Sequence, residues 1–154
     1  MKNALLLMLI LLTATGYSQR SNYKNLFEQN GKIGIGTNEP DALLTVKGDI
    51  HTQEVLVDLK GAVAPDYVFE NYFEGNSKLK PTYEFSNLAE IEKFIEKNHH
   101  LPGVPSAKDL EKNGMSLKAM NLILLEKVEE LTLYIIEQQK EIQALKKAIS
   151  PTKE

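Results

Sequence analysis

The chain has 154 residues, and 18 Lys and Arg stand against 21 Asp and Glu, so its formal net charge is only -3. No basic stripe accompanies this balance, which argues against nucleic-acid binding. The sequence contains no cysteine, which excludes disulfides, thiolate metal sites and a lipid-modified cysteine anchor.

Residues 1–18 are typical of an export signal peptide. Lys2 precedes an apolar run over 4–12, and the small and polar residues "TATGYSQ" follow it. The run is too short to span a bilayer. Gly16 and Ser18 supply the small side chains that a signal peptidase selects, so cleavage is predicted after Ser18. We expect an exported protein, in the periplasm, on the outer surface or outside the cell, with no membrane span after cleavage.

Short β-strands are expected next. Residues 19–30 show no sustained hydrophobic period and are predicted to be a flexible lead-in. Residues 31–62 form the predicted β-strand segment, because apolar residues there alternate with polar ones or glycine, at Ile33, Ile35, Leu44, Val46, Val55, Val57 and Leu59. So few short strands are unstable alone. They need a covering surface, either helices or copies of themselves.

A small α+β head is predicted over 63–115. It opens with a cluster of aromatic residues within seven positions, Tyr67, Phe69, Tyr72 and Phe73. Aromatic side chains contribute much of the buried area of a small core, so the cluster is interpreted as packing. A face on which a ligand stacks is the alternative.

Helix boundaries are marked by capping residues. Asn87 and Glu90 have the spacing of a capping box, at the start of an apolar pattern with helical period. Ser106 is expected to begin a second, short helix, which Gly114 ends. Ser116 is a candidate cap for the last and longest helix.

Residues 116–149 are predicted to form a coiled-coil helix, roughly 50 Å long at ~1.5 Å per residue, and 150–154 a short tail. Apolar residues recur there at alternating intervals of three and four without a slip. We call the ten positions that carry this heptad the seam: Leu117, Asn121, Leu124, Val128, Leu131, Ile135, Gln138, Ile142, Leu145 and Ile149.

The seam predicts self-association, because the chain has no second helix of this length to cover it. Glu141 and Lys146 flank the seam at positions that meet in a parallel arrangement. β-Branched residues on one seam position and leucine on the other favour two strands. Gln138 interrupts the apolar row, and its amide is expected to fix register at some loss of stability.

The first turns of this helix are expected to be buried in the head, because residues 122–125 are apolar in every direction around it. Only the later turns should then project as a stalk. Leu133 and Ile136 lie off the seam, and no segment is predicted to cover them.

Four segments resemble known proteins. "GKIGIGTNEPDALLTVKGDI" resembles the segment that precedes C-terminal tail modules in bacterial surface and phage tail-fibre-like proteins. "APDYVFENYF", "LAEIEKFIEKNHHLPGVPSA" and "LLEKVEELTLYIIEQQKEI" are similar, in that order, to tail-fibre domain proteins of the Bacteroidetes. The resemblance covers about residues 31–145. More distantly, the chain is similar to the intramolecular chaperone domain of phage tail spikes and endosialidases, which implies a trimer.

That chaperone domain cleaves itself with a serine nucleophile in a Ser-Asp-x-x-x-Lys type of segment. Here "DLKGAVAPDYVF" stands in its place. Ser77 with Lys78 and Lys80 is the other nucleophile and base pair to consider. Its loop is expected to be solvated, which would keep each lysine protonated. No catalytic residue is therefore predicted.

No metal site or cofactor is predicted either. His99 and His100 are neighbours whose side chains point about 100° apart in a helix, and His51 is distant in the sequence. Asp41, Asp49 and Asp58 lack the spacing of a calcium loop.

The sequence thus favours an α+β protein that is not an enzyme. The first hypothesis is an exported structural module that forms a homotrimer, or a dimer, through its coiled coil, as part of a surface fibre or adhesin-like assembly. The second is an oligomeric binding module for a surface glycan or protein, with avidity from repeated weak sites. The third is an autoproteolytic chaperone.

Overall fold

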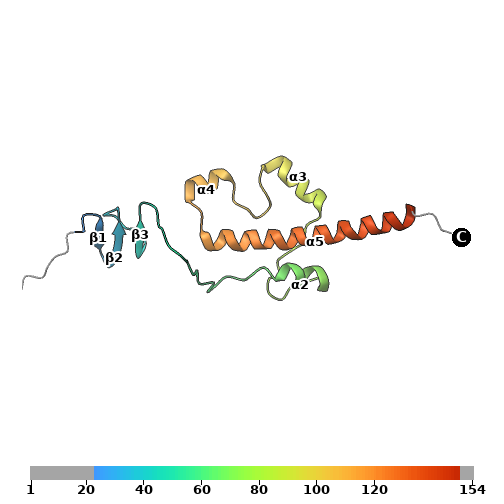
Figure 1. Cartoon of the computed structure of the whole chain (residues 1–154), viewed down its shortest axis with the longest axis horizontal. Helices are drawn as coiled ribbons and strands as arrows, with labels where there is room; N and C mark the ends of the chain where they lie inside the picture. Colours follow the sequence, from blue (N-terminus) through green and yellow to red (C-terminus); the bar gives the residue numbers. More distant parts are fainter. Residues whose placement is uncertain (1–22, 150–154) are drawn as a thin grey trace, which may run out of the picture. The chain divides into compact units, whose positions relative to one another are not determined.

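The computed structural model describes residues 23–149, which form two units, 23–55 and 56–149. The expected signal peptide over 1–18 and the tail over 150–154 lie outside the described residues. Within these residues, the first unit contains three short strands and the second contains four helices, and their arrangement can be followed in Figure 1. The α+β class is therefore confirmed. No helix within 23–149 is long and apolar enough to cross a membrane.

The first unit is a three-stranded sheet with the order β1–β2–β3. Strand β1 spans Leu26–Gln29, β2 spans Lys32–Ile35 and β3 spans Leu44–Val46. β1 and β2 are antiparallel, whereas β2 and β3 are parallel. The strands predicted at β2 and β3 are confirmed.

The lead-in predicted over 19–30 is wrong at its C-terminal end, because β1 lies there. Asn30 and Gly31 both have positive φ, 52° and 75°, and they join β1 to β2. Two residues with positive φ give the tight turn whose twist matches that of a hairpin, and Asn-Gly is its strongest sequence signal. The Asn30-Gly31 dipeptide is therefore the sequence feature from which β1 could have been predicted.

The strand predicted around Val55, Val57 and Leu59 is also wrong, since no residue from 47 to 66 is assigned to a strand. The alternation is present, but a strand needs a neighbour that accepts and donates its backbone hydrogen bonds. No segment within residues 23–149 supplies such a neighbour.

The second unit is helical, so the expectation of a mixed α+β head over 63–115 is wrong. Helix α2 spans Tyr67–Glu74, α3 spans Leu88–Asn98, α4 spans Ala107–Asn113 and α5 spans Leu117–Ile149. In Figure 1, α3 and α4 run beside α5, joined by a loop. The aromatic cluster forms α2, because Tyr67, Val68 and Tyr72 fall on one side of a helix.

The caps lie where the sequence places them. The Asn87 side chain accepts from the backbone N–H of Glu90, and the Glu90 carboxylate accepts from the backbone N–H of Asn87. Ser106 accepts from the Asp109 backbone N–H at the start of α4, and Gly114, with φ of 74°, ends that helix. Ser116 accepts from the backbone N–H of Ala119 at the start of α5.

The core lies in the second unit, where α2 and the loop after it meet the middle of α5. Its buried apolar members are Tyr67, Val68, Tyr83 and Leu133. Burial on α5 is therefore centred near Leu133, later in the helix than predicted. Leu124 and Leu125 in the early turns remain 50% and 45% exposed, so the predicted burial of these turns on all sides is wrong. Leu133, which had no predicted cover, is fully buried against α2.

Candidate functional site

Helix α5 has two apolar faces, and only one of them is covered. Leu133 is fully buried, whereas Leu131 and Ile135 are each 56% exposed. At ~100° per residue, a step of two residues along a helix turns the side chain to the other side. Leu131 and Ile135 therefore project away from the head that covers Leu133.

The exposed face coincides with the seam. On the same helical geometry, all ten seam positions lie within about 60° of the direction opposite to Leu133. Its eight apolar side chains are between 46% and 77% exposed: Leu117, Leu124, Val128, Leu131, Ile135, Ile142, Leu145 and Ile149. Asn121 and Gln138, the two polar members, are exposed too. The described chain thus presents an apolar stripe along the length of α5, interrupted at Asn121 and Gln138.

A polar cluster on the opposite face holds the head to α5. The Glu126 carboxylate accepts hydrogen bonds from the Tyr67 hydroxyl and, at 3.2 Å, from Lys80 Nζ. Lys80 Nζ also lies 4.4 Å from the centre of the Tyr67 ring. Lys127 Nζ lies 3.0 Å from the other Glu126 oxygen. One carboxylate on α5 therefore joins α2, the loop after it and its own helical neighbour.

The pKa values in this cluster follow from its hydrogen bonds. Burial alone would raise the pKa of Glu126, but the hydrogen bonds from Tyr67 and Lys127 outweigh it and the pKa falls below its usual range. Burial would lower the pKa of Lys80, yet its bonds to Tyr67 and Glu126 raise it. Burial, together with the hydrogen bond to Glu126, raises the pKa of Tyr67. Each group keeps its ordinary charge at neutral pH.

Glu130 forms a second attachment one turn later. The Tyr83 hydroxyl donates to Glu130 Oε1 at 3.0 Å, and Lys127 Nζ donates to both Glu130 oxygens at 2.9 Å. Burial and the neighbouring Glu130 charge raise the pKa of Tyr83, so its phenol remains a donor. Loop residue Tyr83 is thereby fixed to the same face of α5 as Tyr67.

Glu129 is the one residue of this face that is poorly satisfied. It is 7% exposed, and its Oε2 atom is buried without a hydrogen-bond partner. Burial, and next the negative charges of Asp66 and Glu126, raise its pKa. An unpaired buried carboxylate destabilises the fold when it is ionised.

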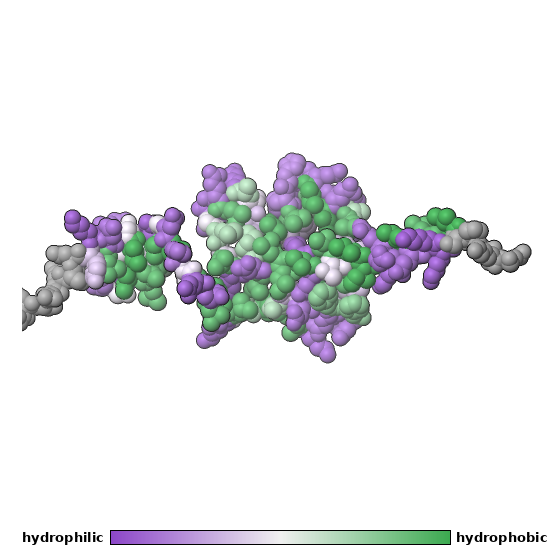
Figure 2. Space-filling view, in the orientation of Figure 1, coloured by the Kyte–Doolittle hydropathy of each residue, from purple (hydrophilic) through white to green (hydrophobic). Residues whose placement is uncertain are grey.

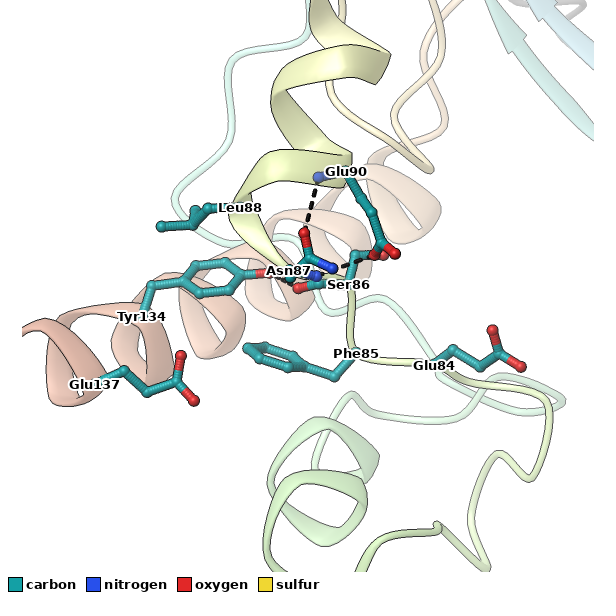
Figure 3. A pocket seen from close by; sticks show the side chains of 8 residues that line it. All are labelled: Glu84, Phe85, Ser86, Asn87, Leu88, Glu90, Tyr134 and Glu137. Carbon is teal, nitrogen blue, oxygen red and sulfur yellow. Dashed lines mark hydrogen bonds between the residues drawn. The ribbon is translucent and has the colours of Figure 1, made fainter.

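A hollow of about 460 Å³ lies between the loop before α3 and α5 (Figure 3). Its aromatic wall is the stacked pair Phe85 and Tyr134, with ring centres 4.9 Å apart. The Tyr134 hydroxyl donates to the Ser86 carbonyl oxygen at 2.6 Å, and burial raises the pKa of Tyr134 to about 12. Glu90, another lining residue, is engaged in the α3 cap.

The predicted aromatic cluster divides between core and surface. Tyr67 is 5% exposed and belongs to the core, whereas Phe69 and Tyr72 are partly buried and pack against it. Phe73 is 70% exposed, with its ring edge-on to Tyr72 at 4.9 Å. Of the four, only Phe73 presents most of its ring to solvent.

Ser77 is buried, contrary to the expectation of a solvated loop. It is 3% exposed, and its hydroxyl donates to Glu70 Oε2 at 2.5 Å and accepts from the backbone N–H groups of Leu79 and Lys80. The hydrogen bond from the Ser77 hydroxyl lowers the pKa of Glu70. The expectation failed because the sequence pattern does not reveal that the Glu70 carboxylate, on α2, accepts hydrogen bonds from Ser77 and from the loop backbone after it.

The histidines serve local structure. His99 ends α3 with φ of 60°, and the His100 ring lies edge-on to Phe94, with centres 5.4 Å apart. Asp41 accepts from the Thr45 hydroxyl at 2.7 Å, and this hydrogen bond lowers its pKa. Among residues 23–149 there is no group of three or more histidine, aspartate or glutamate side chains that could hold a metal ion.

No protein-family model, curated protein or solved structure matches this chain. Its function therefore has to be inferred from the geometry of its own residues.

Proposed function

We propose that the protein is an exported structural and oligomerisation module, tail-fibre-like in kind, which forms a homotrimer through α5 as part of a cell-surface fibre or adhesin-like assembly. The observation that carries the proposal is the exposed seam. It follows the heptad over the whole of α5, and it lies opposite the face that binds the head.

The energetics favour association. Full burial of a Leu, Ile or Val side chain contributes about 1.5–3 kcal/mol. The eight apolar seam residues are roughly half exposed, so each forgoes about 1 kcal/mol in a solitary chain. Sister helices packed seam to seam would recover most of this sum. The head stays in place meanwhile, because its contacts use the other face of α5.

A parallel arrangement is the one that the flanking charges support, since Glu141 and Lys146 meet between neighbouring chains only when the helices run in the same direction. Two considerations bear on the number of chains in the assembly. The choice of β-branched and leucine side chains along the seam favours two, whereas the resemblance to tail-fibre proteins favours three. We adopt three, and a dimer is the alternative outcome of the test.

Sedimentation equilibrium of residues 19–154 tests the proposal. A trimer at micromolar concentration is the expected result. A dimer would keep the coiled-coil function but remove the tail-fibre analogy. A well-folded monomer would contradict the proposal altogether, because the seam would then tolerate water.

A surface binding module is the second candidate, and the exposed ring of Phe73 favours it. Aromatic rings at a protein surface can stack on sugars, and three copies would add avidity. Binding to a glycan array that disappears in Phe73→Ala, with helix content unchanged, would support this function. Phe69→Leu is the matched control, because Phe69 packs against the core.

Self-cleavage is not part of the proposal. The Ser77 hydroxyl is buried in hydrogen bonds, and Lys80 is engaged with Tyr67 and Glu126. Both observations argue against Ser77 and Lys80 as a nucleophile and base pair. Intact-mass measurement checks this: a chain that loses only its signal peptide agrees with the proposal, and an internal cut would overturn it.

A further inference from the structure

The three-stranded sheet of the first unit has one face that its own chain covers and one that it leaves open. Residues paired directly across strands share a face, and the register forms one row of Leu26, Ile35 and Val46 and a second row of Glu28, Ile33 and Leu44. We call the five apolar residues of these rows the apolar sheet face; Glu28, at its edge, accepts a hydrogen bond from the backbone N–H of Gly31. Leu26, Ile33, Ile35 and Leu44 are 46%, 43%, 41% and 58% exposed. Figure 2 shows apolar side chains gathered over these strands.

The opposite face is closed by the loop between β2 and β3. Thr45 is 7% exposed and is held by Asp41 and by the backbone N–H of Ala42. A Cβ placed on Gly34 would lie 2.2 Å from the Thr37 carbonyl oxygen, so the loop backbone rests directly on that face. The loop therefore covers the side of the sheet that carries Gly34 and Thr45, and it leaves the apolar sheet face bare.

This arrangement leaves the first unit without a hydrophobic core. The hydrophobic core cluster lies between residues 67 and 133, whereas the buried residues within 23–55 are only Gly34, Pro40 and Thr45. A sheet of three short strands needs an apolar surface on one side to be stable. Some other surface must therefore cover the apolar sheet face.

We propose that the occupant is the same face of sister chains, so that the sheets pack with their apolar faces together around the axis of the assembly. This inference rests on the proposed function. The face would bury roughly 400 Å² per copy, on the order of half the ~800 Å² that each partner gives to a stable interface. The sheets are therefore too small to associate alone. Tethering to an assembled α5 raises their local concentration to roughly the millimolar range, which removes that limit.

Single cysteines test the inference cleanly, because the chain has none of its own. Ile35→Cys places a thiol on the apolar sheet face, and Phe27→Cys places one on the opposite face of the neighbouring strand. Both are made in residues 19–154 and exposed to a mild oxidant at a concentration at which the chain is oligomeric. We expect Ile35→Cys to form disulfide-linked chains at least tenfold faster than Phe27→Cys.

Three outcomes would overturn it. Equal cross-linking of the two variants, or none in an intact oligomer, would refute the packing of the sheets and leave the coiled coil untouched. A monomeric parent chain would refute both proposals. Equal cross-linking of Ile35→Cys with and without Leu131→Asp and Ile135→Asp would refute the role of the coil. Val46→Cys, together with amide exchange of residues 26–46, supplies a second readout if Ile35→Cys fails to fold.

Discussion

Replacing Ile135 by alanine measures how far the seam is covered by sister chains, and Ile136 provides a matched control of the same residue type. Ile135 is 56% exposed in the single chain, whereas Ile136 is 38% exposed. Neighbouring side chains on a helix point about 100° apart. Ile135 therefore lies on the seam, and Ile136 lies beside the face that holds the head.

The two substitutions should act on different equilibria. Full burial of an isoleucine contributes about 1.5–3 kcal/mol, so covering the exposed part of Ile135 contributes about 1–1.5 kcal/mol per chain. Over three chains this amounts to about 3–4.5 kcal/mol, or roughly a 150- to 1500-fold weaker trimer. Ile136→Ala should instead lower the stability of the folded chain by about 1–2 kcal/mol and leave association nearly unchanged.

Sedimentation equilibrium over about 1–100 µM, combined with thermal unfolding, separates these effects, because association responds to concentration and monomer stability does not. We expect Ile135→Ala to move dissociation to clearly higher concentration and Ile136→Ala to leave it in place. Equal shifts for the two variants would refute the assignment of the seam. So would a parent chain that is monomeric and folded throughout this range.

Four further predictions concern the same helix. Gln138→Leu should raise the melting temperature while broadening the distribution of oligomers seen in native mass spectrometry, and a lower melting temperature would contradict the role given to its amide. Because burial raises the pKa of Glu129, its ionised carboxylate destabilises the fold above that pKa. This loss of stability is relieved as pH falls through the pKa. Glu129→Gln should therefore stabilise the fold by about 1 kcal/mol at neutral pH. This gain over the parent should disappear on acidification, as followed by thermal unfolding between about pH 4 and 8. Tyr83→Phe should cost about 1.5–3 kcal/mol in chemical denaturation, since it removes a hydrogen bond to the charged Glu130, and a loss below half of that would show that Lys127 satisfies the carboxylate alone. The parent melting temperature should rise with protein concentration, and one that is independent of concentration would indicate a self-sufficient monomer.

The helices were predictable from the sequence because their signals are local. Asn87, Ser106 and Ser116 each satisfy a backbone N–H two or three residues away, so the side chain that starts the helix is next to it in the chain. The heptad likewise gave both ends of α5. β1 was missed although Asn30 and Gly31 mark its turn, because the apolar residues of β1 do not alternate.

What the sequence could not supply was the pairing of distant segments. Leu133 is buried by α2, more than fifty residues earlier, and nothing near it in the sequence indicates that cover. Ser77 is organised by Glu70 across a turn. Apolar residues do alternate at Val55 and Val57, yet no strand forms there, because no segment within residues 23–149 pairs with them.

The separation of the two faces of α5 bears on how such a protein assembles. Glu126 and Glu130 bind the head through side chains that point away from the seam. Chains can therefore join without displacing α2 or the loop that carries Tyr83. The core that these contacts enclose is small, with four buried apolar side chains in its cluster, so the head contributes modest stability of its own. Association that orders α5 along its length would stabilise the surface on which the head is built, and this links the folding of the head to the formation of the bundle.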